Sequence, residues 1–191
     1  MVKLERAGEN PGNFELSLPK LAAIDPEFRP RGWRKLTKSL SRDQQRKFQQ
    51  LQEQLAEGEL AAAVVICENP FLIAVYFDEI FDSVVLEFPS WLRQDESHRY
   101  GDQLLAVVTY QDEDEVAKDL RQFPGEQPQV KNFTPQIVNF LVNDQDAVQD
   151  ALELIPQYQW FRTEQTGSDY LMRNVGAVRE GTPSKAGISA L

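Results

Sequence analysis

The sequence predicts an α+β domain with a largely antiparallel sheet of four to six strands and helices packed on that sheet. Two observations predict this class. Residues 60–88, the most apolar part of the chain, divide into three runs of strand length, and a fourth such run follows at residues 103–110. Helical patterns come before and after these strands rather than between them, which is the order of α+β proteins and not of alternating βαβ units.

The three apolar runs lie at residues 60–67, 71–77 and 83–88 and are rich in β-branched and aromatic residues. The short turns between them allow antiparallel hairpins but leave no room for the dozen-residue crossover that parallel neighbours need. Because residues 71–77 are apolar at every position, we predict a central strand there, covered on both faces. The side chains expected to be almost wholly buried are Ile73, Val75, Phe77, Val84 and Leu86.

Residues 1–40 are predicted to form a partly irregular N-terminal arm, because prolines and glycines recur too often for a long helix or a central strand. The arm nevertheless carries regularly placed apolar residues, which indicates that it lies over the core. These residues are Phe14, Leu16, Leu18, Leu21, Ile24 and Phe28.

Residues 41–178 are predicted to form the α+β domain, which begins with a helix over 41–57. Ser41 and Gln44 have the spacing of a capping box, and further helices are predicted over 113–123, 135–143 and 145–155. The helix over 135–143 is predicted from Thr134-Pro135, since a threonine cap followed by proline is typical of a helix start. Residues 158–161 and 170–178 are expected to add a final strand or pair, and 179–191 a flexible C-terminal tail.

Composition narrows the class of protein. The net charge is −10, Cys67 is the single cysteine, and no apolar run approaches the roughly 18 residues that span a membrane. The chain begins without the apolar segment of a signal peptide, and a lone cysteine excludes an internal disulfide and fits a reducing compartment. We therefore predict a cytoplasmic protein that has no cofactor and does not enter a membrane.

The inventory of catalytic residue types is small. His98 is the single histidine, so sites with two or three histidine ligands cannot form within one chain. It lies in a polar stretch and is predicted to be an exposed loop residue. A nucleophilic pair of Cys67 with His98 is conceivable, but Cys67 ends an apolar run, where cysteines are usually inert. The sequence also lacks the glycine-rich motifs that bind phosphates.

Carboxylates between the second and third predicted strands offer one route to catalysis. Asp78, Glu79 and Asp82 supply the oxygen ligands that Mg²⁺ or Mn²⁺ prefers, so a metal-dependent hydrolase is an alternative function. Turn chemistry accounts for the same residues without any metal, and we favour that interpretation.

Charge is distributed unevenly along the chain. Residues 29–47 hold eight basic residues and one acid, whereas residues 48–191 carry a net charge of −15. We define residues 29–47 as the basic segment and predict that it contacts an acidic protein surface, its own or a partner's. RNA contact is a second alternative, disfavoured because the acidic body repels a polyanion. The partner-binding candidates are Arg31, Trp33, Arg34, Lys35, Lys38, Arg42 and Arg46.

These observations favour a non-enzymatic protein-binding module of a chaperone-like, immunity-type or regulatory kind. The expected partner is another protein or a second copy of the chain. We expect no nucleic-acid partner. The support is the scarcity of catalytic residue types together with a polarised charge pattern that suits protein partners.

Overall fold

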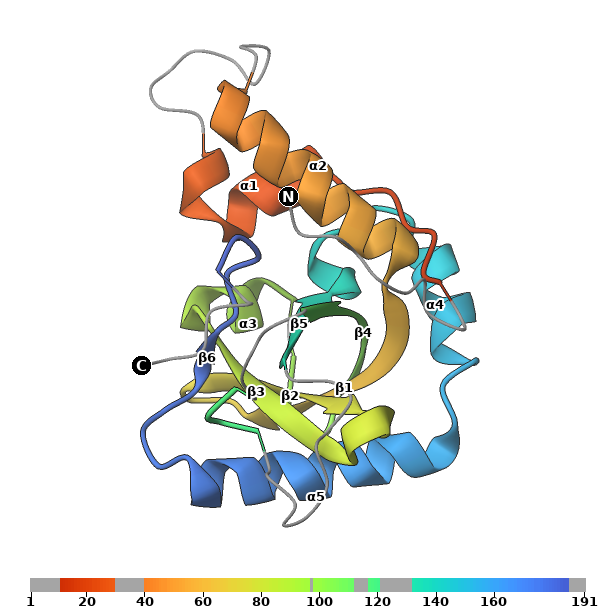
Figure 1. Ribbon diagram of the computed structural model, residues 1–191, viewed down its shortest axis with the longest axis vertical. Helices are drawn as coiled ribbons and strands as arrows, with labels where there is room; N and C mark the ends of the chain where they lie inside the picture. The colour runs from red at the N-terminus through yellow and green to blue at the C-terminus, as the bar shows by residue number, and fades with distance from the viewer. Residues whose placement is uncertain (1–10, 30–39, 97, 112–116, 121–131, 186–191) are drawn as a thin grey trace.

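A computed structural model describes residues 11–29, 40–96, 98–111, 117–120 and 132–185. Over these residues the chain forms a single α+β domain in which helices pack on a six-stranded, mostly antiparallel sheet (Figure 1). The predicted fold class is therefore confirmed. The strands are β1 (Glu59–Cys67), β2 (Phe71–Phe77), β3 (Asp82–Phe88), β4 (Gln103–Gln111), β5 (Asn132–Ile137) and β6 (Arg179–Glu180). The helices are α1 (Leu18–Ile24), α2 (Arg42–Glu57), α3 (Ser90–Glu96), α4 (Gln145–Leu152) and α5 (Gln157–Arg173).

Strand β2 lies inside the sheet, between β1 and β3, in the order β5-β4-β1-β2-β3-β6. All neighbours are antiparallel except β3 and β6, which run parallel. Every residue of β2 is buried, as predicted from its unbroken apolar run. The five side chains predicted to form the core are at most 3% exposed, so this prediction is also confirmed.

Shortening a side chain in β2 tests how much the central strand stabilises the fold. Val75→Ala is expected to lower the free energy of unfolding by about 1–3 kcal/mol, because it removes buried methyl groups and leaves a cavity. The measurement is the urea midpoint, with Val175→Ala as the matched control, since Val175 is 87% exposed. Equal midpoints for the two variants would contradict the central role of β2.

The sheet is strongly curled. Phe77 on β2 and Phe133 on β5 have ring centroids 5.0 Å apart, although two strands lie between β2 and β5 in the sheet. Neighbouring strands are spaced by about 4.8 Å, so in a flat sheet these rings would be roughly 14 Å apart. The curl also brings the two edges together, because Gln136 of β5 donates a hydrogen bond to the carbonyl of Pro183, just beyond β6.

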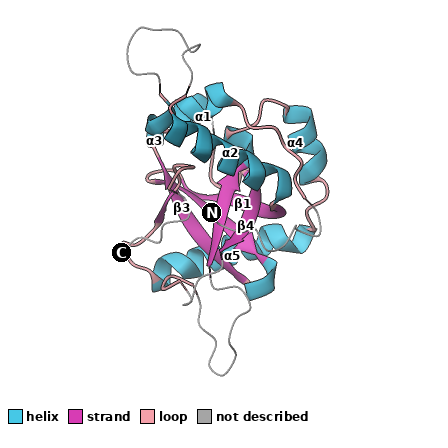
Figure 2. Ribbon diagram, turned by 45° about the horizontal axis from the view of Figure 1, so that its top comes forward, coloured by secondary structure: helices cyan, strands magenta, loops and turns pink. Residues whose placement is uncertain are grey.

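Helices cover the sheet from two sides (Figures 1 and 2). Helix α5 packs across β1, β2 and β3 on one side. Helices α1 and α2 lie on the other side, where α2 packs on β4 and buries Leu51 and Leu55. The predicted capping box of α2 is present, with Ser41 and Gln44 exchanging hydrogen bonds. The apolar residues of the N-terminal arm are buried or, for Leu18, half-buried against the core, as predicted.

Two predicted elements are wrong. Residues 135–143 form the end of β5 and a 3-10 turn (Val138–Phe140) rather than a helix. Pro135 is tolerated there because β5 is an edge strand, bonded only to β4, so no neighbour needs the missing proline N–H. The strands expected at 158–161 and 170–178 are replaced mainly by helix α5, for which Pro156 is the N-cap.

The structure also differs from the predictions for residues 113–123 and for the C-terminal tail. Residues 117–120, the described part of the helix predicted over 113–123, form a turn. The predicted tail begins with β6, and Arg179 is completely buried. The helix predicted over 145–155 is present as α4, from Gln145 to Leu152.

Candidate functional site

The three carboxylates proposed as metal ligands all interact with other groups of the protein, and the partners of Asp78 and Asp82 are side chains. Asp82, which begins β3, is buried and accepts two hydrogen bonds of 2.7 and 2.8 Å from the guanidinium of Arg173 on α5. Asp78 accepts hydrogen bonds from the hydroxyls of Tyr76 (3.2 Å) and Tyr158 (2.7 Å). Glu79 lies beside Asp78 in a 3-10 turn (Asp78–Ile80) and also has an interaction.

These contacts do not resemble a metal centre. Within the described residues, no group of three or more histidine, cysteine, aspartate or glutamate side chains is placed to hold a metal ion. The charge of Asp82 is already balanced by Arg173 at 2.7 Å, and hard cations need several converging oxygen ligands. The geometry therefore gives the hydrolase alternative no support.

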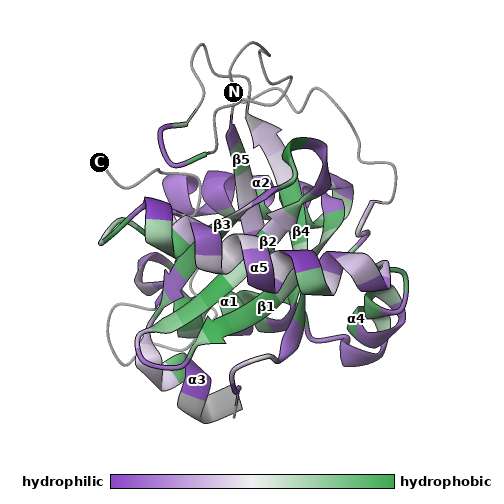
Figure 3. Ribbon diagram, turned by 90° about the horizontal axis from the view of Figure 1, so that it is seen from below, coloured by the Kyte–Doolittle hydropathy of each residue, from purple (hydrophilic) through white to green (hydrophobic). Residues whose placement is uncertain are grey.

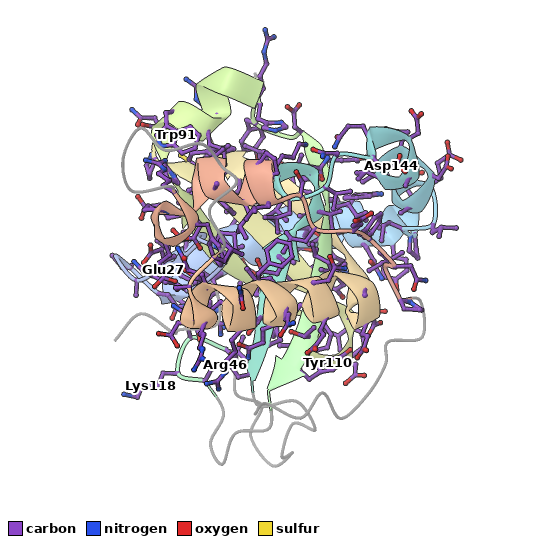
Figure 4. The ribbon with its side chains drawn as sticks, turned by 90° about the horizontal axis from the view of Figure 1, so that it is seen from above. Glu27, Arg46, Trp91, Tyr110, Lys118 and Asp144 are labelled. Carbon is purple, nitrogen blue, oxygen red and sulfur yellow. The ribbon has the colours of Figure 1, made fainter. Side chains whose placement is uncertain are left out.

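The candidate residues of the basic segment lie only partly in the described structure. Five of them fall outside it, namely Arg31, Trp33, Arg34, Lys35 and Lys38. Arg42 and Arg46 are exposed on the first turns of α2, and Figure 4 labels Arg46. Two other members of the segment contact their own chain.

The first is Lys47, which pairs with Glu27 at 2.5 Å. The second is Arg29, which donates to the carbonyl of Ala23 and lies over the ring of Trp91. At these two positions the basic segment packs against its own domain.

The sequence did not predict the exposed apolar residues of α5, the helix that crosses the sheet in Figure 3. This helix buries threonine and glycine beside a large Tyr170 against the sheet, and its exposed side carries apolar residues among polar ones such as Arg162 and Gln165. The buried residues are Thr163, Thr166, Gly167 and Tyr170. The exposed ones are Tyr158 (51%), Phe161 (68%), Met172 (71%) and, just past the helix, Val175 (87%).

The buried side of α5 is held closely to the sheet. A Cβ atom on Gly167 would lie 2.5 Å from the Cβ of Ala74 on β2, closer than carbon atoms can approach. At the preceding residue of α5, the hydroxyls of Thr166 and Ser83 are 2.6 Å apart. Small residues on this side therefore have a packing role, and they fix which residues α5 presents to solvent.

Helix α5 is tied to the sheet at both ends. Near its start, the hydroxyls of Tyr158 and Tyr76 share the carboxylate of Asp78. Burial, and then the charge of Asp78, raise the pKa of Tyr76, so this hydroxyl remains a donor at neutral pH. At the helix end, Arg173 binds Asp82. These contacts hold the exposed apolar residues on a rigid element.

A buried ion pair closes the curled sheet. Arg179 of β6 is completely buried and binds both carboxylate oxygens of Asp119, at 2.6 and 2.9 Å. Its third contact, 2.7 Å, is to the carbonyl of Phe133 on β5. Tyr170 of α5 donates to the same carboxylate at 2.8 Å. Arg179 thus joins the two sheet edges, and the cluster is structural rather than solvent-facing.

The carboxylate of Asp119 should make stability depend on pH. Burial alone raises its pKa, but the hydrogen bonds and charge of Arg179, with the hydroxyl of Tyr170, outweigh burial and hold the pKa below its ordinary value of 3.8. Because the folded-state pKa is the lower one, the contribution is complete above pH 3.8 and is lost as the pH falls through the folded-state value.

We therefore expect the difference in unfolding free energy between wild type and Asp119→Asn to be constant near neutral pH and to shrink in acid. Denaturant unfolding at a series of pH values measures this difference. Asp150→Asn, at an exposed position on α4, is the matched control for the loss of a carboxylate. A difference for Asp119 that persists unchanged in acid would contradict this assignment.

His98 differs from its prediction as an exposed loop residue. Its ring is stacked on Phe71, with centroids 6.2 Å apart, and lies 5.4 Å from Phe140. The side chain is 15% exposed, and its Nδ1 lies 3.6 Å from a carboxylate oxygen of Asp102. Cys67 is a half-buried free thiol at the end of β1. His98 thus packs among the core aromatics, which favours a structural role.

Comparisons with known proteins do not assign this chain to a family. No family model, curated protein or solved structure matches the chain. No described helix is long and apolar enough to cross a lipid bilayer.

Proposed function

We propose that this protein is a non-enzymatic protein-binding module and that the outer side of α5 is its docking surface. The observation that supports the proposal best is the exposure of the large apolar residues Phe161 (68%) and Met172 (71%) on the outer side of α5. Single exposed apolar residues are normal on protein surfaces, but several along one side of one helix mark an interaction site.

Physical chemistry favours a protein as the partner. Aromatic residues and methionine are enriched at the centres of protein interfaces, since each buries a large area in one rigid or adaptable side chain. Contacts of the Tyr158 and Arg173 side chains anchor α5 at both ends, so docking requires little reordering of the helix. Arg162, exposed beside the apolar residues, provides a charge for orientation.

The basic segment supplies a second contact in this proposal. Arg42 and Arg46 are exposed on α2, which lies on the other side of the sheet from α5. We propose that they contact an acidic protein surface, which would steer association more than it adds affinity. The RNA alternative makes a different prediction, namely tight RNA binding that weakens steeply with salt.

A photo-crosslinking amino acid placed at position 161 tests the docking surface in cells of the source organism. The expected result is covalent protein adducts at position 161 that are lost when Met172→Asp is added. Position 149, exposed on α4, is the matched control and should give none of these adducts. Identical adduct patterns at positions 161 and 149, or none at either, would contradict the proposal.

A further inference from the structure

Three pairs of exposed residues, on α5 and just past its end, lie at equal distances from the middle of the helix. The midpoint lies between Thr166 and Gly167, and the two members of each of these pairs match in character. Apolar residues occupy both outer levels, and polar residues occupy the inner level. The mirrored pairs are Tyr158 with Val175, Phe161 with Met172, and Gln165 with Ser168.

We propose that two copies of this chain associate through α5, with the two helices antiparallel about a twofold axis at this midpoint. The inference rests on the proposed function and names the partner as the chain itself. In a twofold interface one surface must complement itself, so each residue meets the residue at the mirrored level of the other copy. Phe161 then packs on the partner's Met172, a favourable contact of sulfur with an aromatic ring.

Charges beside the apolar residues fit the same register. Arg162 is exposed and Asp169 is half-buried, and both project to the same flank of α5 by helical periodicity. Antiparallel pairing about the midpoint places Arg162 near the level of the partner's Asp169, offset by about 3 Å at a rise of about 1.5 Å per residue. Two such opposite-charge pairs form in each dimer, one on either side of the axis.

Self-complementarity favours a second copy over an unrelated protein. An unrelated partner requires an apolar surface but does not require its residues to mirror one another. The contact is small, however. Stable interfaces bury about 800 Å² on each partner, whereas this contact is made by one helix whose exposed apolar residues are Tyr158, Phe161 and Met172, with Val175 just past its end. We therefore expect a weak dimer that forms at micromolar concentrations.

Sedimentation of the purified full chain over a wide range of concentrations tests the proposal. The expected result is a monomer–dimer equilibrium that Phe161→Asp shifts to monomer, at least tenfold in the dissociation constant. Gln149→Asp, an exposed change on α4, should leave the equilibrium unchanged. Since Phe161 is 68% exposed, its replacement should not unfold the chain, and circular dichroism checks this.

A charge exchange tests the register. Arg162→Asp and Asp169→Arg should each weaken dimerisation, and the double variant should restore it, because the two charges meet across the axis. A chain that is monomeric at every concentration would overturn the dimer, as would a dimer that is unaffected by Phe161→Asp. If the double variant remains as weak as the single ones, the antiparallel register is wrong.

Sedimentation and crosslinking together distinguish the α5 dimer from docking of a different protein. A monomeric chain whose position 161 crosslinks to a different protein in cells overturns the dimer and supports the binding module. A monomeric chain without specific adducts at position 161 overturns both.

Discussion

Arg179→Met is expected to lower the free energy of unfolding by about 3–5 kcal/mol, because it leaves the buried carboxylate of Asp119 without its charged partner. Methionine keeps much of the apolar stem of arginine, so the loss reports the charge and hydrogen bonds rather than a large cavity. The carbonyl of Phe133 also loses the donor that links β5 to β6. Urea unfolding measured at neutral pH gives the value.

Two further variants separate the charge effect from a general loss of structure. Combining Arg179→Met with Asp119→Leu removes both charges, so the double variant should lose less than the sum of the two single losses. Lys185→Met is the control, since Lys185 forms a solvent-exposed pair with Glu180 and its loss should leave the urea midpoint nearly unchanged. If Arg179→Met and Lys185→Met have the same midpoint, the buried pair does not hold the sheet edges.

Gly167→Val is expected to cost about 3 kcal/mol, because its Cβ would lie 2.5 Å from the Cβ of Ala74 and the helix would have to move off the sheet. Intrinsic helix propensity points the other way, since valine is a better helix former than glycine. The sign of the change therefore decides between packing and propensity. Thermal or urea unfolding at a low protein concentration measures it.

Ser168→Val is the matched control for this prediction. Ser168 is the next residue along α5 and is exposed, so a valine there meets no sheet atoms. Its effect should be within about 0.5 kcal/mol, as for ordinary surface changes. A stabilised Gly167→Val variant would show that α5 is not packed closely on β2.

Local signals in the sequence determined the part of the fold that short-range physics controls. The unbroken apolar run of β2 required burial on both faces, and the paired spacing of Ser41 and Gln44 required a helix start. Each signal depends on residues within a few positions of one another. The order of helices and strands then restricted the fold class to α+β.

The candidate site was less predictable, because its residues are not marked by a local sequence signal. The sequence drew attention to the carboxylates at 78–82 and to the basic segment, because clustered charges are visible in any sequence. The outer surface of α5 was not visible, since threonine and glycine on the buried side conceal the helical period that apolar residues usually reveal. Only packing against Ala74 and Ser83 shows which side of α5 is buried.

Tertiary structure alone decided where polar residues are buried. Arg179 is completely buried because Asp119, sixty residues earlier, and the carbonyl of Phe133 satisfy its charge and its donors. Pro135 occupies a strand because the sheet ends there, and His98 is packed among aromatic rings because the curl brings Phe71 and Phe140 beside it. The free energy of burying a polar group depends on partners that are distant in the sequence, so no local pattern contains it.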